Sequence, residues 1–229
     1  MLKRFGFLLL LACALVAAAP VHAAAQQTFN FTLGGFVVSG DDAREDDVLN
    51  ENRNFLAFDV DDFNGAAVGA EWLVPVGQFF EAGAGLSFYR RTVPSVYEEF
   101  VDRDGSEIEQ DLRLRIVPLT ATVRVLPLAQ RSGVQPYFGV GVGVFNWRYS
   151  EAGEFVDFTD NSIFREEYVA SGNEIGPVAL GGIRFAGDTI AAGFEIRYQD
   201  VKGELDDRFS SDRIDLGGWT YNFTLGFRF

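Results

Sequence analysis

The stretch 217–229 constrains the fold of this chain more than any other part of the sequence. Large apolar side chains occupy every second position from Trp219 to Phe229, and small or polar residues lie between them. A period of two over about a dozen residues predicts a β-strand with one apolar and one polar face. A soluble edge strand would leave the aromatic face in water. The pattern therefore favours a strand with lipid outside it and other strands on both sides.

The first residues predict a secretory signal peptide over 1–25. Lys3 and Arg4 precede an apolar run, which is followed by small residues that suit cleavage after Ala23 or Ala25. A lipoprotein box around Cys13 is the weaker alternative, because the apolar run continues well past that residue. We expect residues 26–229 to form one domain.

Removal of the signal peptide changes the chemistry that the chain can perform. Cys13 and His22 are the only cysteine and the only histidine, so neither remains in the mature chain. Disulfides and imidazole chemistry are then excluded. The formal net charge of −14 becomes −16 once Lys3 and Arg4 are lost, which argues against nucleic acid as a partner.

Further alternating or apolar segments precede the last one. No later stretch offers eighteen consecutive apolar residues, so a mature chain that crosses a membrane must do so as a closed barrel. We expect eight strands, at about 28–40, 65–75, 79–91, 110–126, 135–149, 174–186, 189–200 and 217–229. The connections alternate between short (75–78, 127–134, 187–188) and long (41–64, 92–109, 150–173, 201–216).

This alternation of connections predicts the fold class. Short turns on one rim and long loops on the other are typical of an all-β, eight-stranded, antiparallel, up-and-down transmembrane β-barrel with periplasmic turns and extracellular loops. A soluble lipocalin-like barrel would have apolar residues inside and polar residues outside. Here the apolar face of each strand is expected to meet lipid. Two aromatic girdles are expected, the turn-side one at Trp72, Phe79, Phe80, Phe185, Phe227 and Phe229 and the loop-side one at Phe88, Trp147, Tyr198 and Trp219.

Two strands are harder to interpret. The alternation in 110–126 changes phase near Pro118, for which we expect a β-bulge. In 135–149, Val140, Val142 and Val144 face one side, while aromatic residues that include Trp147 face the other. We expect the valines to face lipid.

The whole mature chain resembles the small outer-membrane barrels of the OmpA and OmpX type, with OmpW-like barrels as the second choice. The resemblance implies a monomer in the bacterial outer membrane with a polar, largely plugged interior. A terminal Phe preceded by alternate apolar residues also resembles the signal read by the barrel-assembly machinery. The residues of that signal would be Phe229, Phe227, Leu225, Phe223 and Tyr221.

Charged residues divide between the expected barrel and its loops. About 29 of the 33 acidic residues lie in the four long connections or at the adjoining strand tips, against seven basic residues there. Unpaired charges in a narrow lumen are costly, so we expect the remaining charges to pair inside the barrel. That interior network would consist of Glu71, Glu81, Glu195, Arg113, Arg124, Arg184 and Arg197.

Neither an enzyme nor a cofactor protein is expected. The mature chain lacks the histidine on which Ser-His and Cys-His nucleophilic chemistry depends. Carboxylate pairs need shielding from water, which solvated loops would not supply. Asp59, Asp61 and Asp62 are weak candidates for a metal site, because they echo a calcium loop without its correct glycine spacing or its bidentate Glu.

Two functions from different classes remain open. The first is a structural or surface-interaction barrel in contact with outer-membrane lipid and lipopolysaccharide, whose acidic loops bind divalent cations weakly. The second is a narrow channel or lateral conduit for small solutes.

Overall fold

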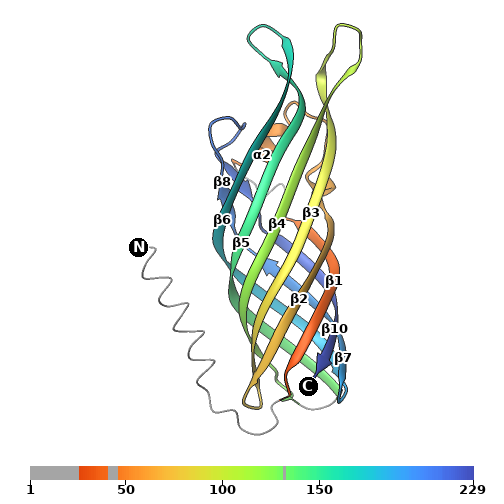
Figure 1. Ribbon diagram of the computed structural model, residues 1–229, viewed down its shortest axis with the longest axis vertical. Coiled ribbons are helices and arrows are strands. Elements are labelled where there is room, and N and C mark those ends of the chain that lie inside the picture. Colours follow the sequence, from red (N-terminus) through yellow and green to blue (C-terminus); the bar gives the residue numbers. More distant parts are fainter. Residues whose placement is uncertain (1–25, 41–45, 131–132) are drawn as a thin grey trace, which may run out of the picture.

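The computed structural model describes residues 26–40, 46–130 and 133–229, so the expected signal peptide lies outside the described residues. The chain forms a closed antiparallel barrel with the strand order β1-β10-β7-β6-β5-β4-β3-β2 (Figure 1). The two remaining strands, β8 and β9, pair with each other in a separate hairpin. The predicted eight-stranded, up-and-down antiparallel barrel is confirmed.

The strands fall into two length classes. Four of the barrel strands are short, with 10–12 residues each: β1 (Thr28–Val38), β2 (Gly65–Val76), β7 (Ile190–Gln199) and β10 (Gly218–Arg228). The other four have 19–25 residues: β3 (Phe80–Val101), β4 (Glu107–Val125), β5 (Gly133–Asp157) and β6 (Ser162–Ala186). A strand of about 9–11 residues crosses a bilayer core, so only the long strands extend well beyond such a length.

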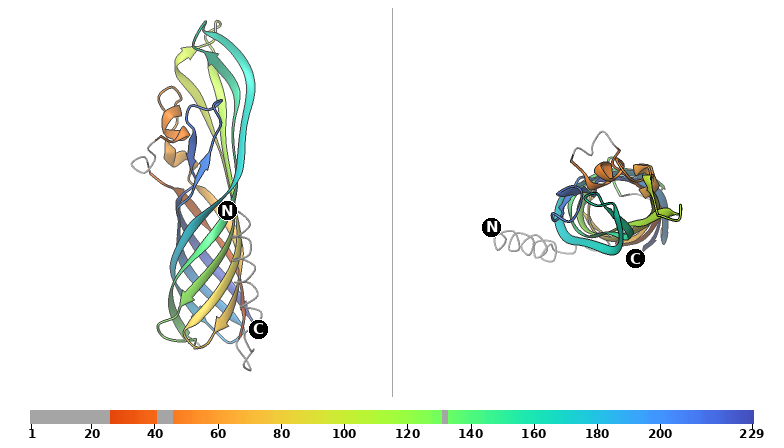
Figure 2. Two further views of the ribbon diagram at one scale, coloured as in Figure 1. Left: turned by 90° about the vertical axis from the view of Figure 1, so that its left-hand side faces the viewer. Right: turned by 90° about the horizontal axis from the view of Figure 1, so that it is seen from above.

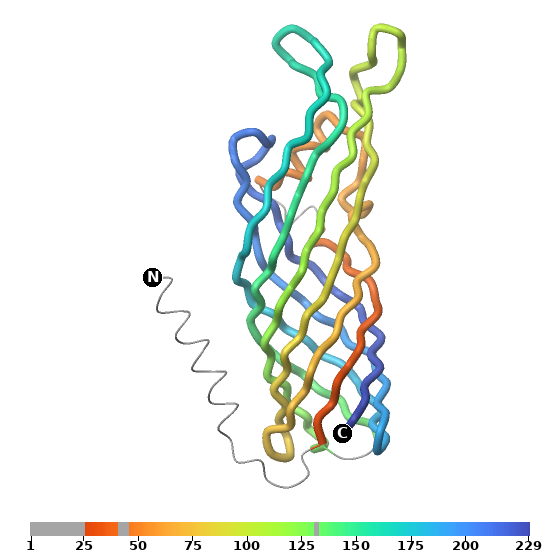
Figure 3. The backbone as a smooth tube through the Cα atoms, in the orientation of Figure 1, coloured from red at the N-terminus to blue at the C-terminus, as the bar shows by residue number. Residues whose placement is uncertain are grey.

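We call the part in which all eight strands pair the lower barrel, residues 28–38, 65–88, 117–146, 174–199 and 218–228. The crown consists of residues 46–64, 89–116, 147–173 and 200–217. In the crown the β3–β4 and β5–β6 hairpins rise far above the ring (Figure 3). Beside these hairpins lie helix α2 (Val48–Asn52), the short helix η2 (Val60–Phe63) and the hairpin of β8 (Lys202–Glu204) and β9 (Arg213–Asp215), as Figure 2 shows.

The crown therefore corrects the expected loops. The segments 92–109 and 150–173 were predicted as long connections, but they are mostly strand, with turns only at 102–106 and 158–161. These segments lack simple apolar alternation, and their strands are identified by cross-strand pairing, for example Val93 with Leu112. The predicted long connections 41–64 and 201–216 carry the helices and the β8–β9 hairpin.

Strand β4 shows how the two regions differ. In the lower barrel, Leu119, Val123 and Val125 face outward while Thr120, Thr122 and Arg124 are buried inside. In the crown the same inner face carries Ile108, Leu112, Leu114 and Ile116, all at most 1% exposed. Along the whole strand every second side chain faces inward. The inward side chains are polar in the lower barrel and apolar in the crown.

The bulge expected at Pro118 is therefore wrong. Pro118 pairs with Phe145 in the same register as its neighbours on β4 and β5. The apolar side chains of β4 change from the inner to the outer face near Pro118, and this shift, without any extra residue, explains the change of phase in the sequence. The irregularity between β3 and β4 lies instead between Val96 and Val101.

Strand β5 behaves in the same way. Val140 and Val142 are exposed on the outer face of the lower barrel, as predicted. Trp147, which was expected in the outer aromatic girdle, faces inward and is 1% exposed, so that assignment is wrong. Gly172 and Gly203 lie against its indole, where an added Cβ would come within 2.8 Å and 2.6 Å of ring atoms. Trp147 is thus a core residue of the crown.

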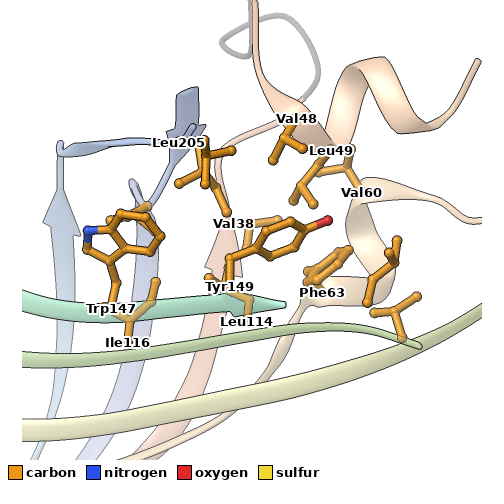
Figure 4. Close-up of a cluster of buried hydrophobic side chains, with 14 of the residues drawn as sticks. Val38, Val48, Leu49, Val60, Phe63, Leu114, Ile116, Trp147, Tyr149 and Leu205 are labelled. Carbon is orange, nitrogen blue, oxygen red and sulfur yellow. The ribbon is translucent and has the colours of Figure 1, made fainter. Parts of the chain in front are cut away.

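The crown has a hydrophobic core like that of a water-soluble protein (Figure 4). Val48 and Leu49 of α2 and Phe63 of η2 are fully buried in it. They pack with inward side chains of β4 and β5 and with residues of the 200–217 segment, among them Leu114, Trp147, Tyr149, Leu205, Ile214 and Leu216. The helices and the hairpin thus cover the apolar inner faces that the four long strands would otherwise expose.

On the opposite rim, the β2–β3 and β6–β7 connections are tight turns, as predicted. Gly77 adopts a φ of 75° in the β2–β3 turn, a conformation that favours glycine. The first and last barrel strands meet at this rim, where Phe229 N donates to Gln27 O at 3.0 Å. Within the described residues, no helix has the length and apolar character that would let it cross a membrane.

Candidate functional site

An apolar belt surrounds the lower barrel. The residues of the expected assembly signal all lie in it, on the outer face of β10 or, for Phe229, directly after that strand. Phe223 and Phe229 are 71% and 69% exposed. Phe31 and Phe227 meet edge to face across β1 and β10, and Tyr198 packs against Trp219 across β7 and β10. Other exposed members include Phe29, Leu33, Trp72, Phe80, Leu86, Leu119, Phe138, Ile175, Phe185 and Ile190.

A four-residue ion network lies inside the lower barrel. Arg124 Nη2 contacts Glu71 and lies 2.7 Å from Glu195 Oε2. Arg197 Nη2 lies 2.9 Å from Glu195 Oε1 and 3.3 Å from Glu71 Oε1. Two guanidinium groups thus balance two carboxylates, and the Tyr137 hydroxyl donates to Glu195 at 3.1 Å.

A second ion pair lies close to the turn rim. Arg184 Nη2 is 2.7 Å from Glu81 Oε1, and the same guanidinium donates to Gln135 Oε1 from Nε at 2.9 Å. Both charged side chains are about as buried as the central network. Six of the seven residues proposed for the interior from sequence are therefore brought together in these two groups.

Small residues make room for the buried arginines. Gly139 of β5 faces the lumen, where an added Cβ would lie 2.9 Å from Leu180 and 3.1 Å from Arg124 Cγ. Above Arg197 there is a cavity of about 40 Å³, bordered by Thr32, Gln199 and Asn222. That volume has room for only a few water molecules.

The expectation for Arg113 is wrong. Its neighbours Leu112 and Leu114 face the interior, so Arg113 points outward, where Nε donates to Thr92 Oγ1 at 3.2 Å. The structure instead reveals an arginine row on the outer face. Arg90 of β3 is paired with Arg115 of β4, and Arg115 with Arg148 of β5, just above the belt residue Phe88. Among the described residues none of these three side chains forms an ion pair.

The three aspartates considered for a metal site serve local structure. Asp59 is the N-cap of η2, and its backbone N–H donates to Asp62 Oδ2 at 2.9 Å. Asp61 Oδ1 accepts from Asn64 at 3.2 Å. Among the residues that the structure describes, no group of three His, Cys, Asp or Glu side chains is arranged to hold a metal ion.

Sequence reasoning missed a shielded carboxylate in the crown. Glu151 was assigned to a solvated loop, yet it faces the crown interior and is 6% exposed. Its Oε1 accepts hydrogen bonds from Asn52 Nδ2 at 2.6 Å and from the Tyr149 hydroxyl at 2.9 Å. Burial raises the pKa of Glu151, and these two hydrogen bonds partly oppose that rise. The sequence shows by alternation that Glu151 shares a face with Trp147 and Tyr149, but not that this face is buried.

Comparison with known proteins gives likeness of structure alone. No family model and no curated protein matches the chain. Ail, the attachment invasion locus protein of Yersinia pestis, is 12% identical over 90% of this chain and 99% of its own, with a TM-score of 0.46. Neisserial surface protein A is 10% identical over 90% and 96%, also at 0.46. The N-terminal β-barrel domain of Pseudomonas aeruginosa OprF is 11% identical over 89% and 97%, at 0.41. Likeness at this level implies no shared ligand or partner.

Proposed function

We propose that this protein is an integral barrel of the bacterial outer membrane that holds its crown on the cell surface for a structural or interaction role. The belt supports this, because large apolar side chains exposed around a whole barrel require an apolar solvent. The strand lengths support it as well, since the four short strands match a bilayer core and the crown lies beyond it. The expected signal peptide and the expected assembly signal would serve export to and assembly at that membrane.

The arginine row indicates which membrane component the barrel contacts. Like charges directly opposite each other on neighbouring strands destabilise a sheet. Arg90, Arg115 and Arg148 form two such pairs in succession, at the upper edge of the belt. Phosphate groups would remove the repulsion and form charge-assisted hydrogen bonds with the guanidinium groups. This level of a barrel is where the headgroup phosphates of lipopolysaccharide are expected.

The charged side chains inside the lower barrel favour an interaction role over a conduit. Eight strands leave an interior just wide enough for side chains. Here the Arg124 and Arg184 groups occupy it, and each is bonded to carboxylates on other strands. We expect little or no steady current from the purified barrel in a planar bilayer. Large, stable, ion-selective currents would favour the conduit instead.

The proposal includes no catalytic role and no cofactor. The acidic residues around the crown would attract Ca²⁺ or Mg²⁺ weakly and at several positions, in part through phosphates shared with lipopolysaccharide. Calorimetric titration with millimolar Ca²⁺ distinguishes this diffuse binding from a single tight site, which would contradict it.

Substitution of the three arginines tests whether the row binds the phosphates of lipopolysaccharide. The triple variant R90Q/R115Q/R148Q, refolded in a neutral detergent, should lose most of its affinity for purified lipopolysaccharide. A matched triple variant, R103Q/R165Q/R213Q, removes three exposed crown arginines away from the row and should bind as the unaltered protein does. Equal lipopolysaccharide binding by all three proteins would contradict the assignment of the row to phosphate. Heat-modifiable migration on gels checks that each variant is folded.

A further inference from the structure

The crown contains a cavity of about 140 Å³ that the proposed membrane role does not use. It lies between the long strands β3–β6 and the segment that follows α2. Exposed Phe158 and Phe164 border it, so it opens toward the surface of the crown. Its inner wall includes Asn52, Phe55, Tyr97, Glu151, Phe155 and Tyr168.

Glu151 presents an uncompensated carboxylate oxygen in this wall. Its Oε1 is occupied by Asn52 and Tyr149. Its Oε2 forms no hydrogen bond or ion pair with any residue in the described parts of the chain. Oε2 is not one of the fully enclosed polar atoms that lack a partner, so it is accessible from the cavity, and a carboxylate in so buried a side chain is stabilised by a charged partner. A cation in the cavity would supply the missing partner.

Aromatic rings line the same cavity in two groups. Phe55 stacks on Tyr97 with ring centroids 5.9 Å apart, and Phe158 meets Phe55 edge to face at 6.2 Å. In the second group Phe155 lies 4.9 Å from Tyr168 and 5.7 Å from Phe164. The negative face of an aromatic ring attracts cations, most strongly where water is excluded.

The surrounding charges also favour a cation. The one basic side chain in the cavity wall among the described residues, Arg208, is bonded through Nε and Nη2 to both carboxylate oxygens of Asp206, at 2.9 and 2.6 Å. The crown as a whole has 25 acidic and 11 basic residues, a difference of −14. A neutral sugar could stack on the rings but would leave the Glu151 charge uncompensated.

We propose that this cavity binds a small organic cation of the alkylammonium class, with the positive headgroup between the rings and next to Glu151 Oε2. The volume suits a headgroup with short alkyl substituents better than a large ring system. An alkylammonium gains from the rings and the carboxylate together, whereas Na⁺ or K⁺ would have to exchange a full hydration shell for one free oxygen. Binding requires a folded crown and does not depend on lipopolysaccharide.

Calorimetry with a matched pair of ligands tests the site. The unaltered protein is refolded in a polyoxyethylene detergent, because detergents with ammonium or sugar headgroups would compete for the cavity. It is titrated with choline and with 3,3-dimethylbutan-1-ol, the neutral molecule of nearly the same shape. We expect choline to bind at least about tenfold more tightly than its neutral analogue. No measurable choline binding, or equal binding of both molecules, would overturn the proposal.

Variants locate the binding in the cavity. E151Q keeps the size of the side chain and removes its charge, and should weaken choline binding about tenfold or more. E167Q removes an exposed carboxylate from the same hairpin and should have no effect. Y168L removes one ring and should weaken choline binding without affecting Glu151. Heat-modifiable gel migration checks that both variants are folded. If folded E151Q and folded E167Q both bind choline as tightly as the unaltered protein does, Glu151 does not bind the cation and the proposal is wrong.

Discussion

Four long strands run through both the lower barrel and the crown, yet the chemistry of their inner and outer faces is opposite in the two regions. On β4, the inward side chains are Thr120, Thr122 and Arg124 in the lower barrel, and Leu112, Leu114 and Ile116 in the crown. One continuous strand therefore buries polar side chains in the lower barrel and apolar side chains in the crown. The difference shows that the solvent outside each segment, lipid or water, decides which face must be apolar.

The two interiors are accordingly held together by different interactions. The lower barrel depends largely on paired charges and hydrogen bonds, since most of its large apolar side chains are directed to the belt and only a small cluster, Leu126, Tyr137 and Leu180, packs inside near the turn rim. The crown depends on burial of apolar area, to which α2, η2 and the β8–β9 hairpin contribute. A substitution that removes either a buried charge or a buried apolar side chain should therefore destabilise one region and leave the other unchanged.

The largest effect is expected in the ion network. Arg124→Met leaves Glu71 and Glu195 with Arg197 as their only cation among the described residues, so the network keeps one uncompensated buried charge. Breaking a buried pair in this way costs about 3–5 kcal/mol. Urea unfolding in detergent micelles measures the loss. The matched variant Arg113→Met, on the outer face of the same strand, should change stability by less than about 0.5 kcal/mol. Similar losses in both variants would show that the interior charges are not what holds the lower barrel.

A smaller effect, confined to the crown, is expected for Leu112→Ala. Leu112 is completely buried, and truncation of such a residue costs about 2–5 kcal/mol. Limited proteolysis and hydrogen exchange should show earlier opening of the crown while the lower barrel stays protected. Leu119→Ala is the control, seven positions further along β4 but 57% exposed in the belt, and should leave the crown unchanged. Simultaneous loss of both regions in Leu112→Ala would mean that they unfold as one unit.

Phe229→Asp should affect assembly more than stability. Phe229 lies at the edge of the belt, where a charged residue costs a barrel only about 0–1 kcal/mol. If the terminal residue is read during assembly, the yield of folded protein in the outer membrane should nevertheless fall several-fold. Heat-modifiable gel migration measures that yield, and Phe229→Leu should restore it. An unchanged yield for Phe229→Asp would remove Phe229 from the assembly signal.

The smallest effect concerns the pH dependence of the crown. Burial raises the pKa of Glu151, and Tyr149 and Tyr97 face it from β5 and β3, with Asp47 before α2 and Arg208 in the hairpin region nearby. An acid whose pKa is raised on folding stabilises the folded state most below its unfolded pKa, near 4.5, and this contribution is lost as the pH rises through the folded value. Crown opening followed by hydrogen exchange should therefore respond to pH more in the unaltered protein than in E151Q. Parallel pH profiles for the two proteins would contradict this.

Much of the lower barrel could be predicted from the sequence by itself. The alternation in β2, β3, β7 and β10 determined the strand number, the apolar belt and the turn-side rim, because side chains on a strand alternate between two faces. It also placed Glu71, Glu195 and Arg197 on the inner face. A narrow lumen then required that such charges meet partners, and the structure shows that they do.

What only the tertiary structure decided is which solvent each face meets. Alternation shows that Arg113, Trp147 and Glu151 each share a face with particular neighbours, but not whether that face borders lipid, water or a protein core. The answer changes part-way along β4 and β5, where the ring of eight strands ends and residues distant in sequence cover the remaining four. Arg113 consequently lies outside, while Trp147 and Glu151 are enclosed. Burial of this kind depends on long-range packing, which no local pattern in the sequence encodes.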